Sequence, residues 1–248
     1  MKKILIFWLI CTLGFSQSNA SFKQANELYN TGFYQEAIEG YTTILESNQH
    51  SAELYFNLAN CYYKLNEIGP SVFYYEKALQ LAPNDADILN NLEYAQKMTI
   101  DAIQEVPENG LSKFINKTLN SLSVDGWAIR SVGLVFLFVI LFLGYYLSQS
   151  ESKKRLFFVS SSVVMLLLIT SLTLLIKKDS LDDKTNPAIV YVKEAEVKAE
   201  PNLRSETSFT LHEGTKVLVI EVYNTNWSKI KLSNGETGWI SNSEIKVL

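Results

Sequence analysis

The residues of this chain that could carry out covalent chemistry or hold a metal are few and scattered. Cys61 is the only cysteine after the first twenty residues, and the two histidines are His50 and His212. Cys61 lies among apolar residues of a helical pattern, while the two histidines fall on either side of two long apolar segments. A cysteine–histidine nucleophile or a zinc site needs such side chains in contact. The sequence therefore predicts no catalytic residue, no metal site and no cofactor, and it places Cys61 in a core.

A second set of polar residues recurs at a spacing that suits binding rather than catalysis. Asn26 and Asn60 are 34 residues apart, and so are Asn57 and Asn91. An asparagine side chain donates and accepts hydrogen bonds at once, which matches the backbone of an extended peptide. The alternative is that these side chains are merely solvated or bond one another.

The same period identifies the elements that would position the asparagines. Residues 18–51 align with 52–85, so that Ala25 recurs as Ala59 and Tyr41 as Tyr75. This is the length of a tetratricopeptide repeat, and the second unit resembles that repeat closely. A helix that starts at an Asn/Asp cap after Pro83 is expected to close the stack. The matching positions of the second unit are Leu58, Ala59, Tyr62, Ser71, Tyr75, Ala78 and Pro83.

In tetratricopeptide repeats the first helix of each repeat lines a concave face, so the resemblance implies a binding groove in this chain. Repeats that clamp a terminal carboxylate use lysine and arginine, whereas the corresponding positions here are Phe22 and Asp87. A C-terminal carboxylate is therefore not implied as the ligand. The residues that would line the peptide-binding groove are Asn26, Tyr29, Asn57, Asn60, Tyr63 and Asn91.

Two segments contain no Asp, Glu, Lys or Arg, namely residues 131–150 and 156–176. Each has about the 20 residues that a helix needs to cross a bilayer. Buried helices of a soluble domain are the alternative, but two such segments only five residues apart favour a transmembrane hairpin. The predicted spans are 127–148 and 156–176, joined by a loop over 149–155.

The N-terminal residues 1–20 have the layout of a secretory signal peptide, with two lysines, an apolar stretch and small or polar residues ending at Ala20. Export of the N-terminus would leave the loop in the cytoplasm, in agreement with its Lys153, Lys154 and Arg155. The predicted location is therefore a bacterial inner membrane crossed twice, with both soluble domains on the periplasmic side.

The exported part before the first span is acidic. Residues 21–126 hold 6 Lys and Arg against 14 Asp and Glu, a net charge of −8, which excludes a nucleic-acid binder because such proteins need a basic face. Residues 21–105 are assigned to the repeats and their capping helix. In the juxtamembrane segment 106–126, apolar residues from Leu111 to Leu122 recur at helical spacing. They indicate an amphipathic helix on the bilayer surface, or alternatively an ordinary packed helix.

After a polar linker over 177–187, the pattern changes from helical to alternating. Strands are predicted over 215–223 and 226–232, with a hairpin turn at Asn234-Gly235. Residues 188–248 resemble a bacterial SH3 domain, in which aromatic residues near the loops commonly form the ligand surface. Trp227 and Trp239 would serve this role, or they are partly buried parts of the barrel, as is common for such side chains.

The order of these parts, with "SLSVDGWA" before the hairpin, resembles the BatE family of the Bat aerotolerance operon. The resemblance implies a non-catalytic inner-membrane protein that works with other Bat proteins, some of which carry von Willebrand A domains. The fold class expected is multidomain: all-α tetratricopeptide repeats, a two-helix transmembrane hairpin and an all-β bacterial SH3-like barrel.

Two interaction modules without a catalytic set favour an adaptor that assembles an envelope protein complex. The alternative is a module that contacts peptidoglycan and recruits cell-wall enzymes. A cell-wall peptidase is rejected because the chain has no peptidase segment. A sensor, in which serine and threonine residues of the second span support helix contact, is a further hypothesis.

Overall fold

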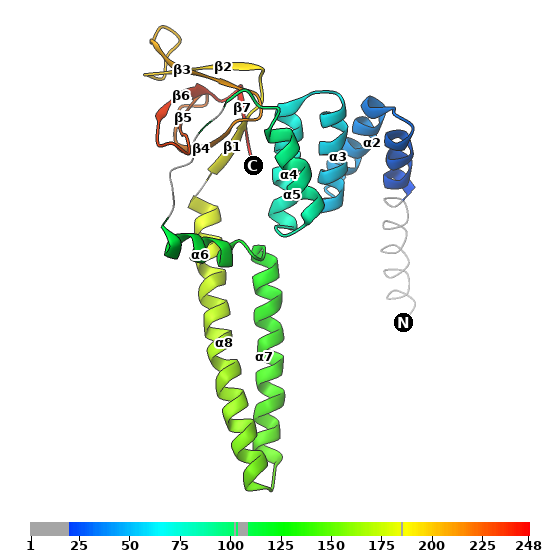
Figure 1. The fold of residues 1–248 in the computed structure, drawn as a ribbon, viewed down its shortest axis with the longest axis vertical. Helices are drawn as coiled ribbons and strands as arrows, with labels where there is room; N and C mark the ends of the chain where they lie inside the picture. Colours follow the sequence, from blue (N-terminus) through cyan, green and yellow to red (C-terminus); the bar gives the residue numbers. More distant parts are fainter. Residues whose placement is uncertain (1–19, 102, 104–108, 185) are drawn as a thin grey trace, which may run out of the picture. The chain divides into compact units, whose positions relative to one another are not determined.

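The computed structural model describes residues 20–101, 103, 109–184 and 186–248 (Figure 1). The described chain forms two compact units, one from the segments before Pro107 and after Thr185, and one from the residues between them. The first unit therefore combines the predicted repeats with the predicted barrel. Except for Ala20, the predicted signal peptide lies outside the described residues.

The N-terminal part of the first unit is a stack of antiparallel helices. Residues 20–30 are helical, and α2 (Tyr34–Glu46), α3 (Ala52–Lys64), α4 (Ile68–Leu81) and α5 (Ala86–Gln96) follow. The helix over 20–30 and α2 make the first repeat, α3 and α4 make the second, and α5 closes the stack. The predicted helical repeat is confirmed.

Side-chain caps set where two of these helices begin. The Ser51 hydroxyl accepts a hydrogen bond from the backbone N–H of Leu54 at the start of α3. The Asp85 carboxylate accepts two, from the N–H groups of Asp87 and Ile88, at the start of α5. These bonds satisfy N–H groups that have no partner within the helix. The Asx cap expected after Pro83 is thus Asp85.

Small and aromatic residues share the core of the repeats. Ala37, Ala59 and Ala78 are fully buried, and the helices approach closely at such positions because the side chains are small. The gaps beside them are filled by Tyr41 and Tyr75, which are also buried and stand 34 residues apart.

The C-terminal part of the first unit is a seven-stranded sheet in which every paired strand is antiparallel, in the order β3-β2-β6-β5-β4-β1-β7. Alternate residues face a small apolar core, for instance Val217 and Val219 of β4 and Ile230 of β5. Gly235 adopts φ +95° in the predicted turn before β6. The strands are β1 (Asn186–Val190), β2 (Glu194–Lys198), β3 (Thr207–His212), β4 (Lys216–Tyr223), β5 (Trp227–Lys231), β6 (Thr237–Ser241) and β7 (Ile245–Val247).

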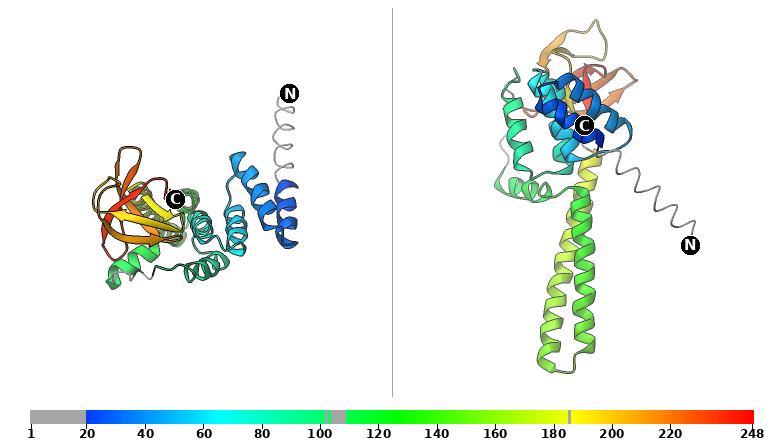
Figure 2. Two further views of the ribbon diagram at one scale, coloured as in Figure 1. Left: turned by 90° about the horizontal axis from the view of Figure 1, so that it is seen from above. Right: turned by 90° about the vertical axis from the view of Figure 1, so that its right-hand side faces the viewer.

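The second unit contains α6 (Gly110–Leu119), α7 (Val124–Leu147) and α8 (Glu151–Lys184). The views of Figures 1 and 2 show α7 and α8 side by side along their length, and α6 lying across one end of the pair. By length and composition, α7 and residues Glu151–Leu181 of α8 could each cross a membrane. Most of their large apolar side chains face outward, as expected for helices surrounded by lipid.

α8 extends past both ends of the predicted second span, 156–176. Only residues 148–150 separate α7 from α8, so most of the predicted loop over 149–155 is the first turn of α8. The Ser150 carbonyl already accepts a hydrogen bond from the Lys154 N–H. At the other end, α8 continues through Lys184 and includes most of the predicted linker over 177–187. Charged residues end the apolar span, but lysine, arginine and glutamate remain good helix formers.

Serine side chains stand between the two long helices. The Ser131 and Ser171 hydroxyls lie 2.9 Å apart across the pair, and both residues are buried. By contrast, Ser162, Thr170 and Thr173 bond backbone carbonyls of their own helix. Of these polar residues, Ser171 is therefore the one that bonds the opposite helix.

Candidate interaction surfaces

The structure brings the four asparagines predicted for the groove together as one row. The Asn57 amide donates a hydrogen bond of 3.1 Å to the Asn26 side-chain oxygen, and the Asn91 amide donates one of 2.9 Å to Asn60. Asn57 and Asn60 stand one turn apart on α3. The row thus crosses the first helix of each repeat and α5, and all four side chains are half-buried.

Buried tyrosines hold two members of this asparagine row in place. The Tyr41 hydroxyl donates to the Asn26 oxygen, and the Tyr75 hydroxyl donates to the Asn60 oxygen. Burial raises the pKa of both tyrosines well above the ordinary value, so they remain neutral donors. Asn26 and Asn60 keep their N–H groups as donors, whereas Asn57 and Asn91 keep their oxygens as acceptors. The asparagines therefore do bond one another, which is part of the alternative to peptide binding that the sequence left open.

The two tyrosines predicted for the groove are half-buried, like the asparagines. Tyr29 and Tyr63 are partly buried and pack against the core of the repeats. The Tyr29 ring also lies 5.5 Å from the Tyr34 ring, and burial raises the Tyr29 pKa. Their rings support the helices of the row and expose only part of their surface.

Trp227 and Trp239 occupy outward positions of β5 and β6: Trp227 precedes the buried Ser228, and Trp239 stands between the buried Gly238 and Ile240. Both tryptophans are half-buried. The Trp239 ring meets the Tyr223 ring nearly edge-on at 6.0 Å, and the Lys229 ammonium lies 5.8 Å from its centre. Tyr223 is also the strand partner of Trp227. We call Tyr223, Trp227, Lys229 and Trp239 the aromatic face of the barrel.

A third surface, which sequence reasoning missed, joins the barrel to the repeats. Asp101 follows α5, and its carboxylate accepts hydrogen bonds from the His212 N–H at 2.7 Å and from the Thr215 hydroxyl at 2.6 Å. The His212 ring nitrogen Nδ1 lies 2.7 Å from the other carboxylate oxygen. Burial alone would raise the pKa of Asp101, but these hydrogen bonds outweigh it and lower the pKa below the ordinary value.

Charged side chains of the barrel also bind α4. The Glu213 carboxylate accepts a hydrogen bond of 3.1 Å from the Gly69 N–H in the first turn of α4. The residue before α4 makes no side-chain cap, so this carboxylate takes that role from the barrel. Further along the helix, the Lys216 ammonium donates to Glu76 at 2.7 Å.

Close apolar contacts fill the rest of this surface, which we call the repeat–barrel interface. The Phe73 and Tyr191 rings meet edge-on at 6.0 Å, and the Lys246 ammonium lies 4.6 Å from the centre of the Phe73 ring. A Cβ on Gly69 would lie 3.2 Å from the Tyr191 carbonyl oxygen, and a Cβ on Gly214 would lie 2.7 Å from a Thr99 methyl carbon. Gly214 also has φ +86°, so glycine is favoured there on two grounds, whereas a Cβ on Gly69 would need its neighbours to move by a few tenths of an ångström.

The composition of α4 was the signal that could have revealed this interface. Residues 68–76 are all buried, so the helix has no solvated face over its first half. A helix that is apolar on every side needs partners on every side. The repeats cover one side of α4, and β1 with its neighbouring strands covers another. The side chain of Ile189 in β1 is therefore part of the core of the repeats.

The cysteine and the two histidines lie at separate places in the structure. Cys61 is buried in the core of the repeats, and burial raises its pKa to about 12, so it is an unreactive thiol. His50 bonds the Tyr55 hydroxyl, whereas His212 lies at the repeat–barrel interface. Within the described ranges, no group of three or more metal-binding side chains gathers.

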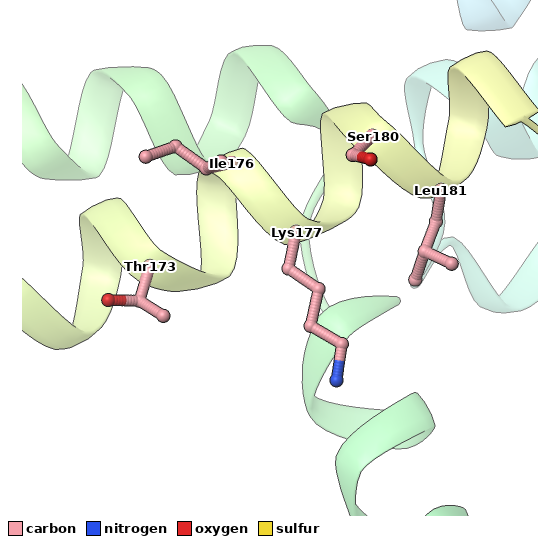
Figure 3. A pocket seen from close by; sticks show the side chains of 5 residues that line it. All are labelled: Thr173, Ile176, Lys177, Ser180 and Leu181. Atoms are coloured by element: carbon pink, nitrogen blue, oxygen red, sulfur yellow. The ribbon is translucent and has the colours of Figure 1, made fainter.

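An open pocket lies along α8 and is lined from one helix alone. Figure 3 shows Lys177 and Leu181 extending to the same side of this helix. The lining residues are Thr173, Ile176, Lys177, Ser180 and Leu181. Its polar groups are the hydroxyls of Thr173 and Ser180 and the ammonium group of Lys177.

Comparisons with known proteins agree with the two interaction modules. Residues 52–85 match the tetratricopeptide repeat family, and residues 193–246 match the bacterial SH3 domain family. The chain contains a tetratricopeptide repeat and a bacterial SH3 domain.

One curated relative is the cell wall-binding protein YwsB of Bacillus subtilis (strain 168). It is 36% identical over 66 residues, which cover 25% of this chain and 37% of that protein. The match therefore spans little more than a third of the relative's length.

Proposed function

We propose that this protein is a non-catalytic membrane adaptor, in which the repeats and the SH3 domain act as one binding body held at the membrane by the α7–α8 hairpin. The observation that carries this proposal is the repeat–barrel interface, which unites two interaction modules in one compact unit. An adaptor of this kind would present both the asparagine row and the aromatic face to its partners. The predicted domain boundaries and the periplasmic orientation of both modules belong to this proposal.

The asparagine row would bind an extended segment of a partner protein. Its amide donors on Asn26 and Asn60, and its side-chain acceptors on Asn57 and Asn91, alternate along the row. A peptide backbone presents carbonyl oxygens and N–H groups in alternation, so it can pair with both kinds of atom. The hydroxyls of Tyr41 and Tyr75 fix the amide orientation of Asn26 and Asn60, which lowers the entropy cost of binding.

Cross-linking in intact cells tests this assignment. We expect Asn57→Ala with Asn91→Ala to reduce the recovery of cross-linked partner proteins at least about tenfold, the loss expected when two hydrogen bonds are removed. The bonds from Tyr41 to Asn26 and from Tyr75 to Asn60 do not involve the substituted side chains, so the fold should persist. The matched control is Asn30→Ala with Asn90→Ala, because both of these asparagines are exposed outside the row. Equal recovery from both double variants would contradict the groove.

The identity of the recovered proteins distinguishes a Bat-type complex from other complexes. The order of repeats, hairpin and SH3 domain supports partners of the Bat type, including membrane proteins with von Willebrand A domains. Their recovery with the wild-type chain, and their loss with the double variant, is the expected result. Recovery of cell-wall enzymes alone would argue for the second function below.

The second candidate function is contact with peptidoglycan, which is favoured by the similarity to a cell wall-binding protein. In this case the aromatic face would contact the glycan and its peptide stems, with Trp239 and Tyr223 as the stacking surfaces. We expect the detergent-solubilised full chain to sediment with isolated cell wall, and Trp239→Ala to abolish sedimentation. The control Tyr94→Ala removes an exposed aromatic residue of α5 instead. A wild-type chain that stays in the supernatant removes this candidate.

A further inference from the structure

The end of the hairpin at which α6 lies is tied together by specific contacts. The Trp127 indole of α7 donates a hydrogen bond of 3.2 Å to the Leu119 carbonyl at the end of α6. The Lys178 ammonium of α8 donates one of 3.1 Å to the Asn120 side chain directly after α6. Trp127 and Leu119 are both buried. α6 is therefore held to both long helices, across their end (Figure 1).

The exposed surface of α6 combines apolar and cationic side chains. Leu111 and Phe114 are 70% and 68% exposed, and Lys113 and Lys117 are exposed as well. Residues 109–123 contain no Asp or Glu, so nothing in this segment neutralises the two lysines. Exposed apolar side chains next to positive charge suit the boundary between hydrocarbon and headgroups.

The pocket on α8 lies at the same boundary. Thr173 and Ile176 belong to the uncharged segment 156–176, whereas Lys177 is the first charged residue after it. The pocket therefore has an apolar part and an ammonium group at its edge, with Leu181 beyond (Figure 3). α6 contacts α8, so Lys113 and Lys117 belong to the same end of the unit.

We propose that this end of the hairpin is a binding site for an anionic phospholipid. One acyl chain lies against Thr173 and Ile176, and the headgroup phosphate pairs with Lys177 and with the lysines of α6. Phosphate is the group that attracts lysine at a membrane surface. An apolar protein segment fits less well, because it offers no negative group to these lysines. This inference rests on a hairpin that spans the bilayer, and it is independent of which proteins the adaptor binds.

Photo-cross-linking in reconstituted vesicles tests the site with the full chain. Vesicles contain phosphatidylglycerol with a photoreactive headgroup, or phosphatidylcholine with the same reactive group, and labelled peptides are mapped by mass spectrometry. We expect phosphatidylglycerol to label residues 110–119 and 173–181 more strongly than phosphatidylcholine does. Lys177→Gln should lower this labelling about fivefold, and Lys113→Gln with Lys117→Gln should lower it further.

The opposite end of the hairpin supplies an internal control. Lys153, Lys154 and Arg155 also attract anionic headgroups, but none of the substitutions touches them, so their labelling should stay constant within each sample. Two results would overturn the site: equal labelling of residues 173–181 by the two lipids, or labelling that is unchanged in the lysine variants. Absence of labelling at both ends would overturn the membrane-spanning hairpin as well, whereas loss of protein partners alone would leave the lipid site intact.

Discussion

The asparagine row and the repeat–barrel interface use similar polar atoms, yet they differ in how completely those atoms are paired. Each of the four asparagines bonds another asparagine and still keeps donors or acceptors on a half-buried surface. At the interface, both oxygens of Asp101 are bonded by the barrel, and Glu213 caps a helix. The row thus retains polar atoms for the proposed peptide ligand, whereas the interface stabilises the first unit.

The largest expected effect comes from the glycine on the barrel side of the interface. Gly214 has φ +86°, and a Cβ there would also meet a Thr99 methyl group, so Gly214→Ala should destabilise the unit by about 3 kcal/mol. Urea unfolding of the solubilised full chain, followed by tryptophan fluorescence, measures the change. Gly235→Ala is the matched control, because Gly235 has φ +95° but no atom near a Cβ, and it should cost about 1 kcal/mol. Equal losses would mean that the close approach at Gly214 contributes nothing.

The next effect tests the carboxylate at the centre of the interface. Asp101→Asn removes a charged acceptor of hydrogen bonds from His212 and Thr215, and should cost about 2 kcal/mol. Its readout is the same unfolding experiment, together with faster hydrogen exchange at the first turn of α4. Glu93→Gln, which breaks a fully exposed ion pair with Lys97, should leave stability unchanged.

The same carboxylate predicts a pH dependence. The pKa of Asp101 is lowered in the folded chain, so its stabilising effect is present above the unfolded pKa of about 3.9 and is lost as pH falls through the folded value. Wild-type stability should therefore drop more steeply than that of Asp101→Asn between about pH 5 and pH 3. Parallel curves for the two proteins would show that Asp101 is not bonded as described.

The smallest effect concerns the asparagine row. Tyr75→Phe removes one donor to Asn60 and should cost about 1 kcal/mol, and Tyr41→Phe should cost a similar amount because its bond to Asn26 repeats the geometry. Tyr94→Phe, at a tyrosine that is 59% exposed, should be neutral. Urea unfolding of each variant measures these changes in the free energy of unfolding. A loss of 3 kcal/mol or more at Tyr75 would make the row a structural network like the interface.

The row could be predicted from the sequence and the interface could not, for physical reasons. Asn26, Asn57, Asn60 and Asn91 follow a period of 34 residues, and stacking places periodic residues side by side. Asp101 and His212 are 111 residues apart and belong to no period, so neither residue type nor spacing pairs them. The sequence left the mutual bonds within the row as an alternative to peptide binding, since they depend on the amide orientations that Tyr41 and Tyr75 fix.

The ends of the hairpin helices could not be predicted from the sequence either. Lack of charge identified two spans in the sequence, because hydrocarbon excludes charged side chains over the length of a helix. It did not predict that α8 would begin at Glu151 and continue to Lys184, because helix propensity does not end where an apolar segment ends. The pocket at Lys177 exists only because the helix continues past the apolar segment.

The cap that Glu213 provides for α4 has a consequence for how the chain acquires its structure. The bond joins residues 144 positions apart, so α4 gains this cap only after the long helices and the strands β1, β2 and β3 have been synthesised. Until then, Phe73 and its neighbours on α4 lack the cover that the barrel supplies. Contacts of such long sequence separation form late and slowly, and exposed apolar surface favours aggregation in the meantime. The nascent repeats are therefore expected to need a chaperone until the C-terminal strands are complete.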